Sequence, residues 1–426
     1  MQFSKYGKQL LVGNGTLQLM EDLGTAHASS EPVLMLGGGN PAHIPEVERH
    51  FQNTMRTIVN DDRAFGAMMG DYDGPQGHAN FIKTLAASLK KKYRWELGPE
   101  NIALTNGSQH SFSLLFNALA GEYDDGSYRK ILLPMTPEYI GYADIVVQSN
   151  VAAGNREASV IEARRPTIER LDNGFFKYHI EFESLYLNES YGAVCVSRPT
   201  NPTGNVISDQ ELEKLIICCR DAGIPLIIDS AYGLPFPNLV FCQARPYWNP
   251  DIIMCMSLSK LGLPGARTGI IIAQEEIIAL VRGANAVNTL APGSVGATLA
   301  TALLKDDSLF TLASNTIQPY YKNRMEKAVV LVKEAMDDLP VLIHQPDGAL
   351  FLWLWFENLP VSCEHLYEML KQKGVYVLPG RHFFPGIKGE WQHMHECIRI
   401  NYAGEDLVVE RGVNIIADTV RSIYRR

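Results

Sequence analysis

The chain has 426 residues, which is too long for one simple core, so we expect more than one domain. Hydrophobic residues make up 46% of the sequence and charged residues 20%, which is the composition of an ordinary globular protein. The formal net charge of −9 argues against nucleic acid and anionic membranes as main partners. Any site that binds anions must therefore be a small cluster of basic residues on an otherwise acidic protein.

Membrane, disulfide and metal chemistry have no support in the sequence. No apolar stretch approaches the length of a membrane span, and residues 1–15 lack the apolar core of a signal peptide, so we expect a cytoplasmic protein. The seven cysteines include no C-x-x-C pair, which indicates reduced thiols. His393, His395 and Cys397 have no second ligand cluster, so we expect no metal.

Short apolar runs alternate with helical patterns from about residue 101 to residue 273. This alternation predicts an α/β fold with a mostly parallel sheet covered by helices on both faces. Strands are predicted at 130–134, 192–197, 225–229, 251–256 and 268–273, and helices at 108–119 and 209–222. We interpret the charged, irregular segment 154–180 as a surface insertion between strands of the sheet.

A second, smaller domain is predicted toward the C-terminus. A long helical region follows residues 291–293 and runs toward residue 339, with a break near Pro319. Strands are then predicted at 348–356, 375–379 and 398–402, followed by a helix at 407–421. The expected organisation is an N-terminal segment 1–50 packed with the small domain, a large domain over 51–304 and a small domain over 305–426.

Polar side chains follow three of the predicted strands. The strands at 192–197, 225–229 and 251–256 end at or lead into Asn201, Asp229 with Tyr232, and Ser257 with Lys260, respectively. Ligands of open parallel sheets bind at the carboxyl ends of the strands. We therefore expect these side chains to meet at one edge of the sheet.

Lys260 follows two serines, Ser257 and Ser259, and Arg267 comes seven residues later. An amine beside hydroxyls and a guanidinium can form a Schiff base with pyridoxal phosphate (PLP) while its neighbours hold the phosphate. Asp229 can keep the ring nitrogen protonated, so that the ring draws electrons from the substrate α-carbon. Tyr232 and Asn201 can donate hydrogen bonds to the phenolate oxygen, and a freed Lys260 can move the α-proton. Together these residues predict amino-group chemistry.

Each signal also has an ordinary structural interpretation. A lysine beside serines is common in surface loops, and an aspartate at a strand end often caps a helix. The Asn-Pro-Thr-Gly segment 201–204 is a strong turn signal, and Tyr232 could be an ordinary core aromatic. The order of these groups at successive strand ends favours the functional interpretation.

The ordered motifs resemble the PLP-dependent class I and II aminotransferases of the aspartate aminotransferase fold over nearly the whole chain. The matching segments are 36–41, 72–77, 106–109, 137–139, 201–204, 229–232 and 257–260, together with Arg267 and Arg399. The resemblance implies fold type I, in which helices sandwich a mostly parallel seven-stranded sheet and a smaller α+β domain follows.

The resemblance also implies a role for each matching residue. Lys260 would carry the cofactor, Asp229 would face its pyridinium nitrogen, and Tyr139 would stack on its ring. Tyr72 would reach the cofactor phosphate of the neighbouring subunit, which implies a homodimer. The other residues expected at the cofactor are Gly107, Ser108, Gln109, Asn201, Tyr232, Ser257 and Arg267. Those expected at the substrate are Gly38, Asn201 and Arg399, although the alternating pattern around Arg399 is by itself that of a solvated strand.

The expected substrates are small amino acids and 2-oxo acids. No obvious second arginine marks a dicarboxylate pocket, which favours neutral, aliphatic side chains. Segments 1–7, 66–77 and 197–205 resemble bacterial aminotransferases that act on valine and pyruvate, which give 2-oxoisovalerate and alanine.

Three alternative functions remain at this point. They are another neutral or aromatic amino acid aminotransferase, a C–S β-lyase of the same fold, and a transcription regulator with an aminotransferase-like domain. Because the motif series begins near Leu36, we expect no room for the added DNA-binding domain of such a regulator.

Overall fold

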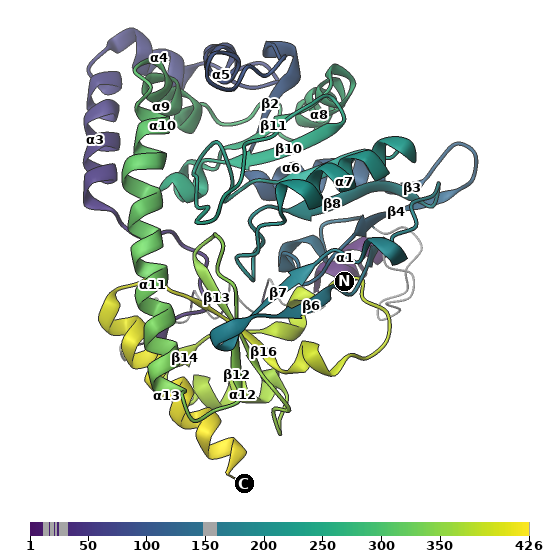
Figure 1. Cartoon of the computed structure of the whole chain (residues 1–426). Coiled ribbons are helices and arrows are strands. Elements are labelled where there is room, and N and C mark those ends of the chain that lie inside the picture. The colour runs from purple at the N-terminus through teal and green to yellow at the C-terminus, as the bar shows by residue number, and fades with distance from the viewer. Residues whose placement is uncertain (12–16, 18–20, 22–23, 25–32, 148–159, 426) are drawn as a thin grey trace.

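The computed structural model describes residues 1–11, 17, 21, 24, 33–147 and 160–425. A large sheet occupies the upper half of Figure 1 and a smaller sheet the lower half. A long helical run passes from one half to the other, and it consists of α10 (Ser308–Leu312), a π-helical turn (Ala313–Ile317) and α11 (Gln318–Ala335) (Figure 1). The predicted break near Pro319 is this π-helical turn, which ends two residues before the proline, the residue that lacks a backbone N–H.

The large sheet has the strand order β2-β11-β10-β9-β8-β4-β3, with β5 beside β4. The strands β10, β9, β8, β4 and β5 are parallel, whereas β11 runs antiparallel to both β10 and β2. The mostly parallel sheet is confirmed, and it has eight strands rather than seven because the short β3 forms a hairpin with β4. The bounds are β2 (Ile102–Thr105), β3 (Gly121–Glu122), β4 (Tyr128–Leu133), β5 (Ile161–Ala163), β8 (Tyr191–Ser197), β9 (Leu226–Asp229), β10 (Ile252–Ser257) and β11 (Gly269–Ile272).

Helices cover both faces of this sheet, because successive strand residues point to opposite sides and nearly all are apolar. On one face, α6 (Ser108–Leu119) and α8 (Glu275–Asn288) bury Phe112, Phe116 and Val281 against the strands. On the other face, α5 (Ala79–Tyr93) and α7 (Asp209–Asp221) bury Leu85 and Leu212. The other helices described before α10 are α1 (Lys5–Leu11), α3 (Pro45–Val59), α4 (Asp62–Gly70) and α9 (Ser294–Lys305).

The small sheet has the strand order β15-β16-β13-β12-β7-β6. The α12 (Cys363–Lys371) and α13 (Asp406–Tyr424) helices follow in the same C-terminal region. The N-terminal segment joins this half of the molecule, because β1 (Leu34–Met35) pairs with β14 (Val375–Tyr376). The strand bounds are β6 (Thr167–Arg170), β7 (Phe175–His179), β12 (Val341–His344), β13 (Phe351–Phe356), β15 (Leu378–Pro379) and β16 (Cys397–Asn401).

The interpretation of segment 154–180 as a surface insertion is wrong for its described part, which begins at residue 160. The β6–β7 hairpin extends the small sheet, since β7 runs parallel to β12. It buries Phe176 and Tyr178 completely, which accounts for its place in the core. The hairpin lies in the sequence range expected for the large domain, so the small sheet is assembled from two distant parts of the chain.

The hairpin also holds the loop that follows β8. Asn205 Nδ2 donates to the Tyr178 carbonyl at 3.1 Å, and Lys177 Nζ donates to the Val206 carbonyl at 3.2 Å. Lys177 forms an ion pair with Asp347, which comes from the C-terminal half of the chain. The loop of the large domain that carries Asn201 is therefore tied to the small sheet.

Across the described ranges, no helix combines the length and the apolar character that crossing a membrane requires. Among the same residues, no three histidine, cysteine, aspartate or glutamate side chains are grouped so as to hold a metal ion.

Two histidines are buried in the small domain beside Tyr178. His344 Nε2 accepts a hydrogen bond from the Tyr178 backbone N–H at 3.2 Å, and its ring stacks on the Tyr178 ring with 5.0 Å between centroids. His393 lies against Trp355, with 4.4 Å between ring centroids. Burial lowers the pKa of His393 to about 3, and burial also holds the pKa of His344 well below 6.5. Both rings are neutral in the folded protein.

Acid should destabilise the protein through these two rings. Below about pH 6.5 the unfolded chain binds protons at both histidines and the folded chain does not, which costs up to about 1.4 kcal/mol per pH unit for each ring. The double variant His344→Gln/His393→Gln should therefore lose less melting temperature than the wild type between pH 7.5 and pH 5.5. The exposed His365→Gln is the matched control. Equal losses in the wild type and the double variant would contradict the assignment.

Candidate active site

The ends of three adjacent parallel strands form the base of the site. In the register of the sheet, Ser197 at the end of β8 lies beside Asp229 at the end of β9, and Asp229 lies beside Cys255 in β10. The next turn after β10 is a 3₁₀ helix, Ser259–Leu261, which carries Lys260. The expectation that these strand ends meet at one edge is therefore confirmed by the register.

Asp229 is almost fully buried at this edge. Its carboxylate accepts hydrogen bonds from the Tyr142 hydroxyl at 2.8 Å and from the Ala231 N–H at 2.9 Å. Burial raises the pKa of Asp229 to about 6, while these hydrogen bonds and the charge of Lys260 act in the opposite direction. A nearby cation would lower this pKa further, so the carboxylate is suited to face a protonated ring nitrogen.

Lys260 presents its amine to the same site. Its Nζ donates to the Gly39 carbonyl at 2.6 Å and lies 5.4 Å from the centre of the Tyr232 ring. Burial, together with the charges of Arg399 and Arg267, lowers the pKa of this amine to about 8, and the charge of Asp229 opposes them. An amine of this kind is readily available in its neutral, nucleophilic form.

A cradle for an anion lies at the start of α6. Gly107 precedes the helix with a φ of 91°, and a Cβ there would lie 2.2 Å from Nη2 of Arg267. Only glycine lets the guanidinium approach the helix start so closely. The backbone N–H groups that begin at Ser108 and the charge of Arg267 give this place the character of a phosphate site.

Two serines complete the turn between β10 and Lys260. The Ser257 hydroxyl donates to the Ser259 hydroxyl at 3.0 Å and accepts from the Ser259 N–H at 3.1 Å. Gln109, which we expected at the cofactor, donates from Nε2 to the Gly141 carbonyl at 3.0 Å. This bond fixes the turn that carries Tyr139, and a direct contact of Gln109 with the cofactor stays a prediction.

Arg399 enters the site from β16 of the small sheet. Its side chain is buried, not solvated, and its guanidinium lies over the Phe351 ring at 4.0 Å from the centroid. Nη1 donates to Asn201 Oδ1 at 2.7 Å, and Nη2 donates to the Gly37 carbonyl. Nε has no hydrogen-bond partner among the described residues. A substrate carboxylate would satisfy a guanidinium held in this way.

The remaining predicted residues lie in different places. The Tyr139 ring packs perpendicular to the Tyr142 ring, with 5.4 Å between centroids. Gly38 is held at the end of the Arg399 strand, because its carbonyl accepts from Asn401 Nδ2 at 2.7 Å, and its contact with the substrate stays a prediction. The structure leaves Tyr72 86% exposed, so in a single chain it faces solvent.

Sequence reasoning missed Tyr142 and gave no role to Glu138. Both lie in the segment after β4, where Tyr139 had been assigned to the ring. Tyr142 is one helical turn beyond Tyr139 in a 3₁₀ helix (Ile140–Tyr142), and that spacing is the signal that could have suggested it.

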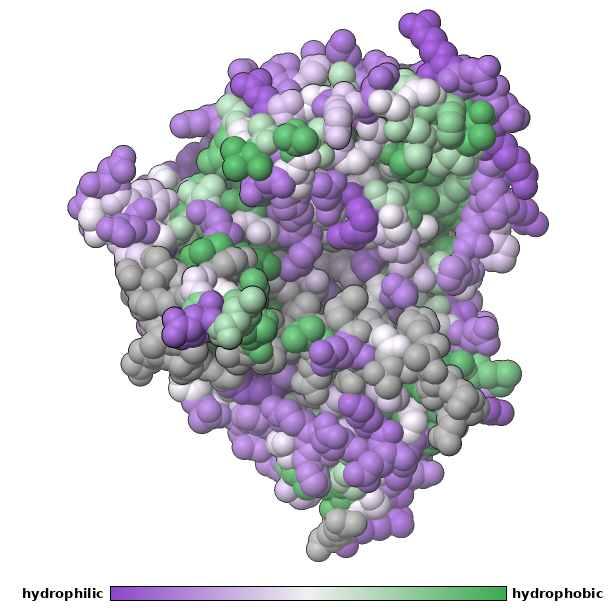
Figure 2. Space-filling model, turned by 180° about the vertical axis from the view of Figure 1, so that it is seen from behind, coloured by the Kyte–Doolittle hydropathy of each residue, from purple (hydrophilic) through white to green (hydrophobic). Residues whose placement is uncertain are grey.

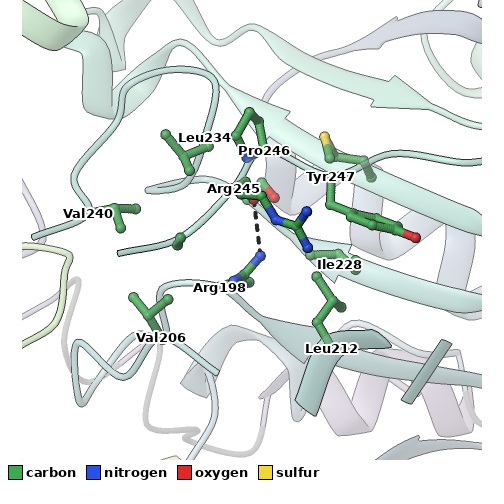
Figure 3. Close-up of a pocket in the computed structure, with 12 residues that line it drawn as sticks. Arg198, Val206, Leu212, Ile228, Leu234, Val240, Arg245, Pro246 and Tyr247 are labelled. Carbon is green, nitrogen blue, oxygen red and sulfur yellow. Dashed lines mark hydrogen bonds between the residues drawn. The ribbon is translucent and has the colours of Figure 1, made fainter. Parts of the chain in front are cut away.

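Two cavities lie near these strands. The larger, of about 140 Å³, adjoins Lys260 and has mostly apolar walls, which include Ile44, Val47, Phe51 and Ile317. The other, of about 20 Å³, lies between Arg198, Leu212 and Tyr247 (Figure 3). The smaller cavity has room for about one water molecule, so it is not a ligand site.

Comparison with known proteins places this geometry in context. Residues 63–416 match the family described as aminotransferase class I and II. Valine–pyruvate aminotransferase of Escherichia coli (strain K12) is 46% identical over 424 residues, covering 100% of this chain and 99% of the relative. The crystal structure of valine-pyruvate aminotransferase from Salmonella typhimurium LT2 has a TM-score of 0.87 and 45% identity, covering 96% of this chain and 99% of that one. A candidate amino-acid aminotransferase from Psychrobacter arcticum 273-4 has a TM-score of 0.95 and 43% identity, covering 100% of both chains.

Gly107→Ala should weaken binding of the phosphate group. The new Cβ would displace the Arg267 guanidinium, and an alanine at this φ is strained by about 1 to 3 kcal/mol. We expect PLP to bind at least about tenfold more weakly to this variant, as measured by absorbance titration of the cofactor-free protein. Gly265→Ala, in the turn before Arg267 and with open space around it, is the control. Equal affinity in both variants would show that the anion binds elsewhere.

Proposed function

This chain belongs to the class I and II aminotransferase family, and we propose that it exchanges an amino group between valine and pyruvate to give 2-oxoisovalerate and alanine, with PLP as its cofactor. The observation that carries the proposal is the convergence of Lys260, Asp229 and Arg399 in one buried site. The identity of 46% over the full length to the valine–pyruvate enzyme of Escherichia coli supports the choice of substrates.

The residues present fit PLP at both of its ends. The cradle of Gly107 and Arg267 is suited to the phosphate, because a Cβ at Gly107 would fill it. The buried carboxylate of Asp229 is suited to the ring nitrogen, and the amine of Lys260 to the aldehyde carbon. When bound, PLP supplies a conjugated ring that accepts the electron pair of the breaking Cα–H bond.

The side chains of this protein would divide the remaining tasks. Arg399 would bind the α-carboxylate of the substrate through its guanidinium, and Asn201 would keep that guanidinium in place. Lys260 Nζ would remove the α-proton in its neutral form and return it on the reverse path, as its lowered pKa permits. Asp229 would stay ionised and hold a proton on the ring nitrogen.

The cavity beside Lys260 supports a small aliphatic substrate. Among the described residues that line it, none is an arginine, and apolar side chains such as Ile44, Val47 and Phe51 form much of its wall. Lys260 also lines it, but the proposal assigns this amine to the cofactor, and His43 lies against Glu48, so a second carboxylate would be desolvated there without a guanidinium to bind it. This argument favours valine and alanine over aspartate.

We further propose that the active form is a homodimer to whose sites Tyr72 contributes. The loop of Tyr72 is anchored, because Asp73 accepts a hydrogen bond from the Ser294 hydroxyl at 2.7 Å. Figure 2 shows apolar surface gathered over the half of the molecule that holds the large sheet. Several apolar side chains are exposed on this half. Phe65 and Met69 lie in α4, Val287 lies in α8, Val295 lies in α9, and Leu290 lies between α8 and α9. Exposure of this kind is typical of a protein interface.

The substrates can be tested one half-reaction at a time. Single amino acids are added to the PLP-loaded enzyme, and absorbance follows conversion of the bound aldehyde form to the amine form. Valine and alanine should convert it fastest, and Lys260→Ala should lose nearly all conversion because no other amine replaces its proton transfer. Faster conversion by aspartate or aromatic amino acids would reject the valine and pyruvate assignment. Release of pyruvate and thiol from cystathionine would instead indicate a β-lyase.

Mixed dimers can test the role of Tyr72. Tyr72→Ala should bind PLP about tenfold more weakly or worse, the value of one hydrogen bond to a charged group. When Tyr72→Ala and Lys260→Ala subunits are mixed, each mixed dimer should hold one complete site, and about a quarter of all sites should become active. Activity that stays at the level of the separate variants would show that Tyr72 does not act across subunits.

A further inference from the structure

A line of buried hydrogen-bonding side chains runs from Asp229 into the interior. The Tyr142 hydroxyl donates to Asp229 Oδ2 at 2.8 Å and lies 3.3 Å from the Ser197 hydroxyl oxygen. The Ser197 hydroxyl lies 2.5 Å from Glu138 Oε2, and the Ser197 N–H donates to Glu138 Oε1 at 2.8 Å. The four residues come from three segments, which are the segment after β4 and the ends of β8 and β9.

None of this line is accessible to solvent. Glu138 and Tyr142 are 0% exposed, Ser197 is 2% exposed and Asp229 is 8% exposed. Glu138 is also fixed from the small domain, because its N–H donates to the Phe383 carbonyl at 2.8 Å. No lysine, arginine or histidine among the described residues forms an ion pair or hydrogen bond with Glu138. A buried carboxylate without a cation is costly unless it holds a proton.

The direction of the hydrogen bonds follows from the one donor that each hydroxyl has. The Tyr142 hydroxyl donates its one O–H to Asp229, so in a hydrogen bond with Ser197 its oxygen must be the acceptor. If Glu138 were ionised, Ser197 would donate its O–H to Glu138, and the contact between Tyr142 and Ser197 would then have no donor. If Glu138 holds a proton and donates it to Ser197, the Ser197 O–H is free for Tyr142 and both contacts are hydrogen bonds. The short contact between Ser197 and Glu138 is complete when Glu138 is a carboxylic acid that donates to Ser197.

We propose that Glu138 is a positioning residue of the aminotransferase site: as a neutral acid it starts a line of O–H donors through Ser197 and Tyr142 that ends on Asp229. The line aims its last O–H at the carboxylate that would face the cofactor's ring nitrogen. It thereby holds the negative charge on Asp229 rather than on Glu138. This inference rests on the proposed function for the role of Asp229, but the state of Glu138 can be measured without substrate.

The electrostatics of the site agree with this assignment. Burial, together with the charge of Asp229, raises the pKa of Glu138 to about 8, even though the hydrogen bonds that Ser197 would donate to an ionised Glu138 act in the opposite direction. Asp229 has the lower pKa, so near pH 7 Glu138 is the carboxyl that keeps its proton. The other titratable groups facing Glu138 among the described residues are Tyr142, Tyr139 and Cys195, which carry no positive charge.

The sign of the effect on stability is opposite to that of an exposed carboxylate. Because the pKa of Glu138 is higher in the folded than in the unfolded chain, its contribution is fully present below the ordinary pKa of 4.5 and is lost progressively as pH rises from there through about 8. Glutamine in its place cannot ionise, and its amide can still donate to Ser197 and accept from the Ser197 N–H. Glu138→Gln should therefore remove this loss.

The first experiment compares melting temperatures of the PLP-loaded wild type and Glu138→Gln between pH 6 and pH 9. The variant should gain melting temperature relative to the wild type as pH rises, with most of the gain between pH 6 and pH 8 and little beyond. Glu122→Gln, at an exposed carboxyl, is the control and should show no such gain. A difference that does not change with pH, or that grows toward low pH, would show that Glu138 is ionised and overturn the proposal.

A second variant tests the far end of the line. Tyr142→Phe leaves Glu138 and Ser197 in place but removes the donor to Asp229, which should lower kcat about tenfold, the value of one hydrogen bond to a charged group. KM for the amino donor should change little, because Arg399 still binds the carboxylate. The double variant Glu138→Gln/Tyr142→Phe should resemble Tyr142→Phe in kcat, since both residues act through one line. Additive losses would overturn the proposal. If valine is not a substrate, the melting curves still decide the state of Glu138, so failure of the proposed function is distinguishable.

Discussion

The central constraint of this structure is a carboxylate and an amine that share one poorly solvated place at the ends of β9 and β10. Burial alone would neutralise both groups, since it raises the pKa of Asp229 and lowers that of Lys260. Their mutual attraction and the hydrogen bonds from Tyr142 and Ala231 keep Asp229 in its charged form more easily. The amine meanwhile stays close to losing its proton, which is the state that covalent chemistry requires.

The rest of the molecule largely buries this pair and places a guanidinium in the same site. Arg399 reaches the site from the small sheet and is covered by the ring of Phe351. Its hydrogen bonds to Asn201 and to the Gly37 carbonyl join the small domain, the large domain and the N-terminal segment at a single guanidinium. A side chain that links three parts of the chain fixes their relative positions as well as binding a carboxylate.

Most strands of the large sheet, and the site residues that follow them, could be predicted from the sequence because both depend on local patterns. The strand ends at Asp229 and Lys260 follow from continuous apolar runs with polar residues after them, and α6 agrees with its predicted range of 108–119. The short β3 was missed because two residues carry no periodicity. Tyr142 and Glu138 were not assigned because their contacts depend on how separate segments approach each other, which residue type and spacing do not specify.

The β6–β7 hairpin could have been recognised in part. Residues 175–179 alternate between partly exposed and buried positions, with Phe176 and Tyr178 inside, which is the pattern of a strand with one face in a core. The charged residues of β6, among them Arg170, concealed it because they lie on an edge strand, where charge is common. What no local pattern could reveal is the partner of β7, since β12 lies far along the chain.

That distant pairing affects how the protein is made. During synthesis on the ribosome, the hairpin emerges long before β12. Its aromatic side chains therefore lack their strand partner while the large domain is being completed. The loop that carries Asn201 is also not fixed until β7 is in place, because Asn205 and Val206 form their hydrogen bonds with residues of β7. The catalytic edge of the sheet therefore reaches its final shape only after the C-terminal region has been synthesised, and a nascent chain cut short before β12 would hold the lysine without the geometry to use it.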